Sequence, residues 1–93
     1  MNALTIFYLE GCPYCAGARR AYAALTAANA DYARVPVEWI EETEQAALAE
    51  RYDYFRVPSF FLGERKLFEA RLFDRYEDIE SALRAALDAA LDA

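Results

Sequence analysis

The chain has 93 residues, of which 57% are apolar, 15% aromatic and 28% charged. This length predicts one small domain over residues 1–93, because typical domains hold about 100–150 residues. Sixteen acidic and ten basic side chains give a net charge of −6. We therefore expect no nucleic-acid partner, because an acidic domain without a basic stripe repels phosphate backbones. The chain has no histidine, so it lacks the commonest general base and metal ligand.

The first strand candidate is the apolar run at residues 3–9, which Glu10 and Gly11 end. No Lys or Arg precedes this run, and it is too short for a membrane span or a signal peptide. We therefore expect no membrane association and a cytoplasmic location. We also expect a monomer.

Residues 13–28 have the helical spacing of apolar residues, with Pro13 at the first helical position and Asn29 as a stop.

Residues 32–40 alternate in a way that predicts a second strand, which should lie at a sheet edge because Pro36 cannot donate a ladder hydrogen bond. A second helix is expected over residues 43–52. Residues 57–62 and 65–70 read as two strands joined by a turn at Gly63 and Glu64, as in a hairpin.

The last predicted element is a helix opened by Asp74 and Glu77, which resemble a capping box. Its polar face is acidic, so we expect it to pack on its own sheet and not on a membrane. Its apolar stripe consists of Ile79, Ala82, Leu83, Ala86, Leu87 and Ala90. A further aromatic group is expected in the core: Tyr52, Tyr54, Phe55, Phe60 and Phe61.

These elements follow the order β-α-β-α-β-β-α, which predicts an α/β fold. The first helical crossover makes strands 1 and 2 parallel, and the final hairpin is antiparallel. One four-stranded mixed sheet in the order 2-1-3-4, flanked by helices on both faces, satisfies these constraints.

The strongest chemical signal is the segment Cys12-Pro13-Tyr14-Cys15, between a predicted strand and a predicted helix. Residues three apart on the first helical turn lie on one face, close enough for their sulfurs to bond. Free backbone N–H groups and the helix dipole favour the thiolate of Cys12, while Cys15 lies one turn deeper. We therefore assign Cys12 as the nucleophile and Cys15 as the resolving thiol of a dithiol–disulfide exchange.

Other interpretations of the two cysteines stay open. They can be inert core residues, half of a metal site shared between chains, or ligands of an iron–sulfur cluster shared between two chains. A complete zinc site needs four ligands, and the chain has no further Cys and no His. We expect no metal and no organic cofactor.

Two segments, Phe7-Tyr8-Leu9-Glu10-Gly11-Cys12-Pro13-Tyr14-Cys15 and Arg56-Val57-Pro58-Ser59-Phe60-Phe61-Leu62-Gly63, resemble the glutaredoxins of the thioredoxin-fold superfamily. The element order matches that family over essentially the whole chain. The resemblance implies a thioredoxin fold and an enzyme that reduces disulfides. It also implies a cis bond before Pro58, which would leave the backbone of Val57 available to an extended substrate.

Further residues near the two cysteines are expected to belong to the site. Pro13 and Tyr14 should contact substrate together with Val57 and Pro58. Arg19 is a candidate for favouring the thiolate or binding a substrate carboxylate, although a solvated position on the helix is the simpler interpretation. The expected partners are disulfide-containing proteins or glutathione as a co-substrate.

The chain also departs from the glutaredoxin pattern. Glutaredoxins usually carry Lys or Arg three residues before the first cysteine, where this chain has Leu9. They usually carry a Gly-Gly pair after the hairpin, which residues 66–71 lack. One alternative is therefore a thioredoxin-like protein or a hydrogen donor to ribonucleotide reductase, itself reduced by a flavin disulfide reductase. A second alternative is a binding module or a carrier of a shared cluster.

Overall fold

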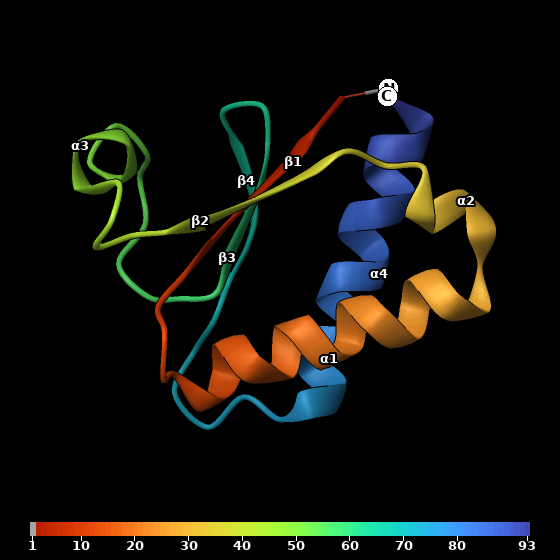
Figure 1. The fold of residues 1–93 in the computed structure, drawn as a ribbon, viewed down its shortest axis with the longest axis horizontal. Coiled ribbons are helices and arrows are strands. Elements are labelled where there is room, and N and C mark those ends of the chain that lie inside the picture. Colours follow the sequence, from red (N-terminus) through yellow and green to blue (C-terminus); the bar gives the residue numbers. More distant parts are fainter. Residues whose placement is uncertain (1) are drawn as a thin grey trace.

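Four strands and four helices lie along residues 2–93, the part of the chain that this computed structural model describes (Figure 1). In chain order they are β1 (Leu4–Tyr8), α1 (Pro13–Ala28), α2 (Ala30–Ala33), β2 (Val37–Glu41), α3 (Ala46–Ala49), β3 (Ser59–Leu62), β4 (Arg65–Glu69) and α4 (Tyr76–Asp92). Among these residues, no helix has the length and apolar character needed to cross a bilayer.

The four strands form one mixed sheet in the order β2-β1-β3-β4. β1 pairs with β2 in parallel, and the pairs β1–β3 and β3–β4 are antiparallel. The predicted α/β class, strand order and edge position of β2 are thus confirmed, and the topology is thioredoxin-like. In the β1–β3 register Phe7 faces Ser59, so the start of β3 lies at the sheet end where β1 finishes.

Helices cover both faces of the sheet (Figure 1). α1 and α4 pack together on one face, where Leu4, Ile6 and Phe60 join the main core with the buried stripe of α4. On the other face Phe7 and Phe61 pack with Ile40 under the segment that contains α3. Successive residues of β1 and β3 therefore supply opposite cores, as the period of two in a strand requires.

The predictions for α1 and α4 are confirmed in their extent and buried faces, but the predicted cap of α4 is wrong. The helix begins after Arg75, whose N–H donates to the Asp78 carboxylate at 2.8 Å. Asp74 accepts instead from the N–H of Arg71 at 2.7 Å. Asp74 therefore closes a turn before the helix and does not pair with Glu77.

The predicted second strand begins too early. Asn29 Oδ1 accepts from the N–H of Asp31 at 2.9 Å and starts the short helix α2, which includes Tyr32. Pro36 lies directly before β2, and its carbonyl accepts from the N–H of Leu4 at 2.9 Å. The proline therefore contributes an acceptor to the sheet, and its missing N–H falls outside the strand.

The helix predicted over residues 43–52 is reduced to the single turn of α3. Glu41 Oε1 accepts from both the N–H and the hydroxyl of Thr43, each at 2.6 Å. These bonds hold the chain in a turn after β2, and the helix starts only at Ala46.

The hairpin forms as predicted, with Gly63 at φ 61° in its turn. β3 starts at Ser59 and β4 ends at Glu69, so both strands are slightly shorter than predicted. Phe60 and Phe61 are buried and Tyr52 and Tyr54 are half-buried, but Phe55 is 91% exposed. The prediction that Phe55 lies in the core is therefore wrong.

Candidate active site

The junction between β1 and α1 presents the two cysteines. Gly11 has φ 85°, in the left-handed region that glycine adopts without steric cost. Cys12 then takes an extended conformation as the N-cap of α1, and Pro13 is the first helical residue. The carbonyl of Cys12 accepts from the N–H of Ala16 at 3.0 Å, which closes the first helical turn. Both cysteines are therefore on that turn, as predicted from their spacing.

The two thiols have different environments. Cys12 is half-buried, whereas Cys15 is only 2% exposed. Burial raises the pKa of Cys15 to about 12, although the N–H of Leu9 donates to its Sγ at 3.5 Å and opposes this shift. At neutral pH Cys15 is thus a protected, protonated thiol beside a more accessible one.

A cavity of about 370 Å³ opens beside these thiols. Its lining residues come from the end of β1, the following loop and the start of α1: Tyr8, Leu9, Glu10, Gly11, Cys12, Pro13, Cys15, Ala16, Arg19 and Arg20. A larger hollow of about 570 Å³ lies near α3 and contains no cysteine. We place the candidate site at the smaller cavity because it holds the reactive groups.

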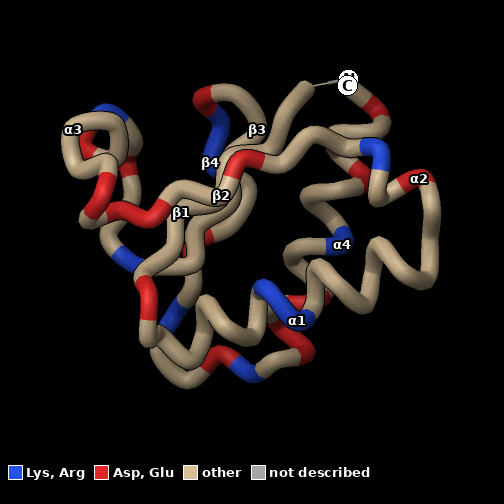
Figure 2. The backbone as a smooth tube through the Cα atoms, viewed as in Figure 1, with Lys and Arg blue, Asp and Glu red and all other residues tan. Residues whose placement is uncertain are grey.

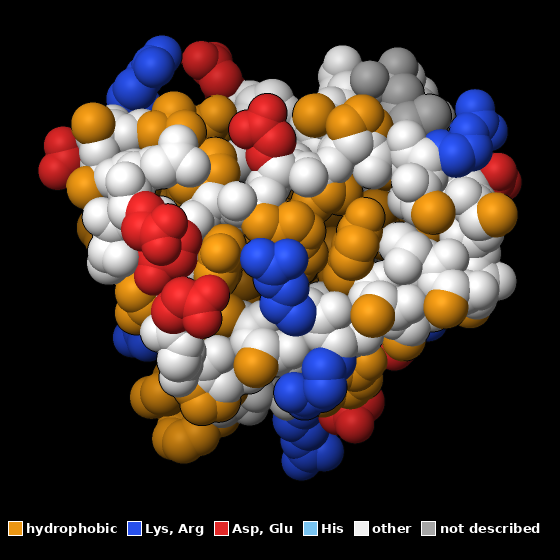
Figure 3. Space-filling view, viewed as in Figure 1, with side chains coloured by type: hydrophobic (Ala, Val, Ile, Leu, Met, Phe, Trp, Pro, Cys, Tyr) orange, Lys and Arg blue, Asp and Glu red, His pale blue; other side chains and the backbone are white. Residues whose placement is uncertain are grey.

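Arg19 belongs to this cavity and is held by aromatic side chains. Its guanidinium lies 4.0 Å from the ring centroid of Trp39 and 4.9 Å from that of Tyr8. Figure 2 shows adjacent basic positions on α1, and Figure 3 shows basic side chains lying against hydrophobic ones on this side of the molecule. Arg19 is therefore exposed but stacked, at the edge of the cavity that contains Cys12.

Val57 and Pro58 lie at the same sheet end, directly before β3, and the bond between them is cis as expected. Pro58 is buried and Val57 half-buried. Among residues 2–93, no hydrogen bond engages the backbone N–H or C=O of Val57. Neither residue lines the thiol cavity. They lie beside it, directly before the strand that pairs with β1.

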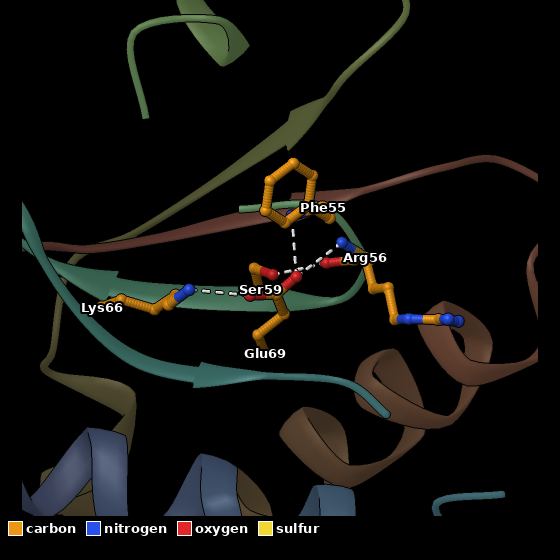
Figure 4. A network of polar contacts seen from close by, with 5 residues as sticks. All are labelled: Phe55, Arg56, Ser59, Lys66 and Glu69. Carbon is orange, nitrogen blue, oxygen red and sulfur yellow. Dashed lines mark hydrogen bonds and ion pairs between the residues drawn. The ribbon is translucent and has the colours of Figure 1, made fainter. Parts of the chain in front are cut away.

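Glu69, which was not predicted as a site residue, holds the loop before Pro58 (Figure 4). Its Oε2 accepts from the N–H groups of Phe55 and Arg56 at 2.7 and 2.8 Å, and its Oε1 from Lys66 Nζ at 2.7 Å. Burial raises the pKa of Glu69, but these hydrogen bonds outweigh it and the pKa lies below its usual value. No sequence signal marked Glu69, because residues three apart in a strand lie on opposite faces and the two backbone donors are 14 and 13 positions away.

A second carboxylate holds the loop that leads to Cys12. Glu41 is 7% exposed, and its Oε2 accepts from the N–H of Glu10 at 3.2 Å. The bonds from Thr43 and from the N–H of Glu10 lower the pKa of Glu41. This buried carboxylate therefore connects the end of β2 to the loop after β1.

Tyr14 connects the dithiol motif to the segment between β4 and α4. Its hydroxyl oxygen accepts from the N–H of Phe73 at 3.0 Å. Phe73 has φ 71°, a left-handed conformation that is rare for an aromatic residue. Phe73 was not predicted from the sequence, because no local pattern marks an aromatic residue for this conformation.

Within residues 2–93, no group of three or more Cys, Asp or Glu side chains is arranged to hold a metal ion. No protein-family model matches the chain, and no curated protein matches it. The geometry of the dithiol and its surroundings therefore carries the functional assignment.

We predict that iodoacetamide alkylates Cys12 before Cys15 in the reduced protein at pH 7–8. The thiolate is the reactive form, and burial with a pKa raised to about 12 keeps Cys15 protonated in this range. Peptide mapping by mass spectrometry after short exposures measures the order. Faster alkylation of Cys15 would show that the assigned roles are reversed.

We predict that Glu69→Gln lowers the free energy of unfolding at pH 7 by about 1–2 kcal/mol, the scale of charge-assisted hydrogen bonds that are partly exposed. Because the folded pKa of Glu69 is depressed, this contribution exists above the unfolded pKa and disappears as pH falls through the folded one. The difference in the free energy of unfolding between wild type and variant should therefore disappear in acid.

Urea unfolding at pH 7 and at pH 3 provides the measurement. Glu64→Gln is the matched control, because Glu64 is an exposed residue of the same hairpin with no hydrogen bond or ion pair within residues 2–93. Equal losses in the two variants, or a gap that persists at pH 3, would contradict the role of Glu69.

Proposed function

We propose that this chain is a glutaredoxin-like thiol–disulfide oxidoreductase that works through Cys12 and Cys15. The observation that carries the proposal is the unequal pair of free thiols on the first turn of α1, with Cys12 half-buried and Cys15 buried. Such a pair separates attack from resolution. The first thiol is accessible to a substrate disulfide, and burial keeps the second thiol protonated until it is needed.

The proposed reaction has two steps. The Cys12 thiolate attacks one sulfur of the substrate disulfide, and the other substrate sulfur leaves as a thiolate that takes up a proton. Cys15 then loses its proton and attacks Cys12 Sγ, which releases the second substrate thiol. Two electrons pass to the substrate, and the protein is left with a Cys12–Cys15 disulfide. An external thiol reductant restores the dithiol.

The residues around the thiols have separate tasks in this proposal. Pro13 sets the first helical turn, and Tyr14 supports the neighbouring segment through its hydroxyl. The unengaged backbone of Val57 can pair with an extended substrate, and Pro58 shapes the groove beside it. Arg19, at the edge of the thiol cavity, can meet a substrate carboxylate.

We propose glutathione as a weak electron donor. Glutathione is anionic, and Leu9 stands where a cation usually precedes the motif. The family's glycine pair is also absent, and losing one charged hydrogen bond costs about 1–3 kcal/mol. These departures favour the alternative in which a flavin disulfide reductase restores the dithiol. The reducing cytoplasm is the compartment that suits either donor.

We predict that Cys15→Ser traps a mixed disulfide between Cys12 and the substrate, because the resolving attack is removed. Cys12→Ser should abolish disulfide reduction and form no adduct. Adducts are measured by intact mass after each pre-reduced variant, freed of reductant, is mixed with a protein disulfide, because dithiothreitol would cleave a mixed disulfide. Activity is measured separately, as turnover of the protein disulfide above the rate with dithiothreitol alone. A Cys12→Ser protein that keeps full activity would refute the proposal.

We predict that glutathione with glutathione reductase supports only slow reduction of a protein disulfide by this chain. The rate is compared with that of an assay in which thioredoxin reductase supplies the electrons for the same protein disulfide. Replacing Arg19, Arg56 or Arg71 by Gln should weaken glutathione binding further, since these cations are the available substitutes for the missing one. Low-micromolar glutathione affinity that none of these replacements changes would contradict the charge argument.

A further inference from the structure

An adjacent pair of large apolar side chains is exposed next to the candidate site. Among residues 2–93, the exposed large hydrophobic residues are Phe55 at 91%, Leu72 at 59% and Phe73 at 83%. Leu72 and Phe73 are neighbours in the turn between β4 and α4. A small domain needs its apolar residues in the core, so an exposed adjacent pair requires an explanation.

The backbone of this turn is fixed at a steric cost. Phe73 is the one non-glycine residue with positive φ within residues 2–93, at 71°. The Arg71 carbonyl accepts from the Asp74 N–H at 3.0 Å, and the Asp74 carboxylate accepts from the Arg71 N–H at 2.7 Å. A glycine or asparagine would fit this conformation more easily, so the phenyl ring is not there to form the turn.

The turn is joined directly to the dithiol motif. The N–H of Phe73 donates to the hydroxyl of Tyr14, which lies between the two cysteines in sequence. The exposed pair therefore borders the start of α1. Phe55 lies elsewhere: it lines the hollow near α3, and Figure 4 shows its ring directed away from the Arg56 side chain.

The charges beside the pair are mixed. Arg71 and Arg75 are exposed on either side of it. The carboxylates of Asp74 and Asp78 accept from the backbone N–H groups of these arginines and keep their own negative charge. The exposed apolar side chains therefore distinguish this turn, and its charge selects neither sign of partner.

Because this turn is hydrogen-bonded to Tyr14 of the dithiol motif, we infer that Leu72 and Phe73 form a docking surface for a disulfide-bearing protein segment that carries a large apolar residue beside its cysteine. This inference rests on the proposed function. Glutathione has no large apolar side chain, so it gains nothing from Leu72 and Phe73. The surface therefore selects protein disulfides over small polar ones.

The test uses two synthetic peptides with one internal disulfide, identical except for Leu or Ser beside the first cysteine. With dithiothreitol as reductant, the wild type should show about tenfold higher kcat/KM for the Leu peptide, the effect of one well-buried apolar contact. Phe73→Asn should reduce that ratio to about one. Asparagine tolerates the left-handed conformation and keeps the N–H to Tyr14, so its thermal unfolding midpoint should not fall.

Phe55→Asn is the matched control, because it removes a similarly exposed ring that lines the hollow near α3 and does not belong to the turn beside Tyr14. It should keep the tenfold ratio. A wild type without preference, or a Phe73→Asn protein that retains it, overturns the inference. A wild-type dimer in sedimentation that Phe73→Asn dissociates also overturns it, since a second copy would then be the occupant. Failure to reduce either peptide would instead refute the proposed function.

Discussion

The whole site depends on the way the backbone turns from β1 into α1. Gly11 in the left-handed region lets the chain reverse, so that Cys12 becomes the N-cap and Pro13 begins the helix. The helix then carries Cys15 inward, where burial keeps its thiol protonated. A side chain in place of Gly11 would meet open space but would strain the backbone, so the glycine is required for conformation and not for packing.

Two carboxylates hold the loops on either side of this turn. Glu41, at the end of β2, accepts from the N–H of Glu10, and Glu69, at the end of β4, accepts from the N–H groups of Phe55 and Arg56. Each carboxylate satisfies backbone donors that no strand or helix can pair. The two edge strands of the sheet therefore fix the loops that lead to Cys12 and to Pro58.

Elements with strong local patterns could be predicted from the sequence. The apolar spacing along α1 and α4, the run in β1 and the turn at Gly63 lead to the correct sheet order. Contacts between residues distant in sequence could not be predicted. The hydrogen bond from Arg56 to Glu69 joins residues 13 positions apart, and the bond from Phe73 to Tyr14 joins residues 59 positions apart. The bond of Asn29 that starts α2 is local by comparison. At the site, the spacing of Cys12 and Cys15 between a predicted strand and a predicted helix identified them. No pattern indicated that Phe55 or Phe73 is exposed.

The central claim is that Cys12 and Cys15 cycle between a dithiol and an internal disulfide. The most direct measurement is the intact mass of the reduced protein after titration with oxidised glutathione, followed by digestion to locate the linkage. We expect loss of two hydrogen atoms per chain, a Cys12–Cys15 crosslink and no lasting glutathione adduct. An unchanged mass, or a stable adduct on either cysteine of the wild type, would contradict it.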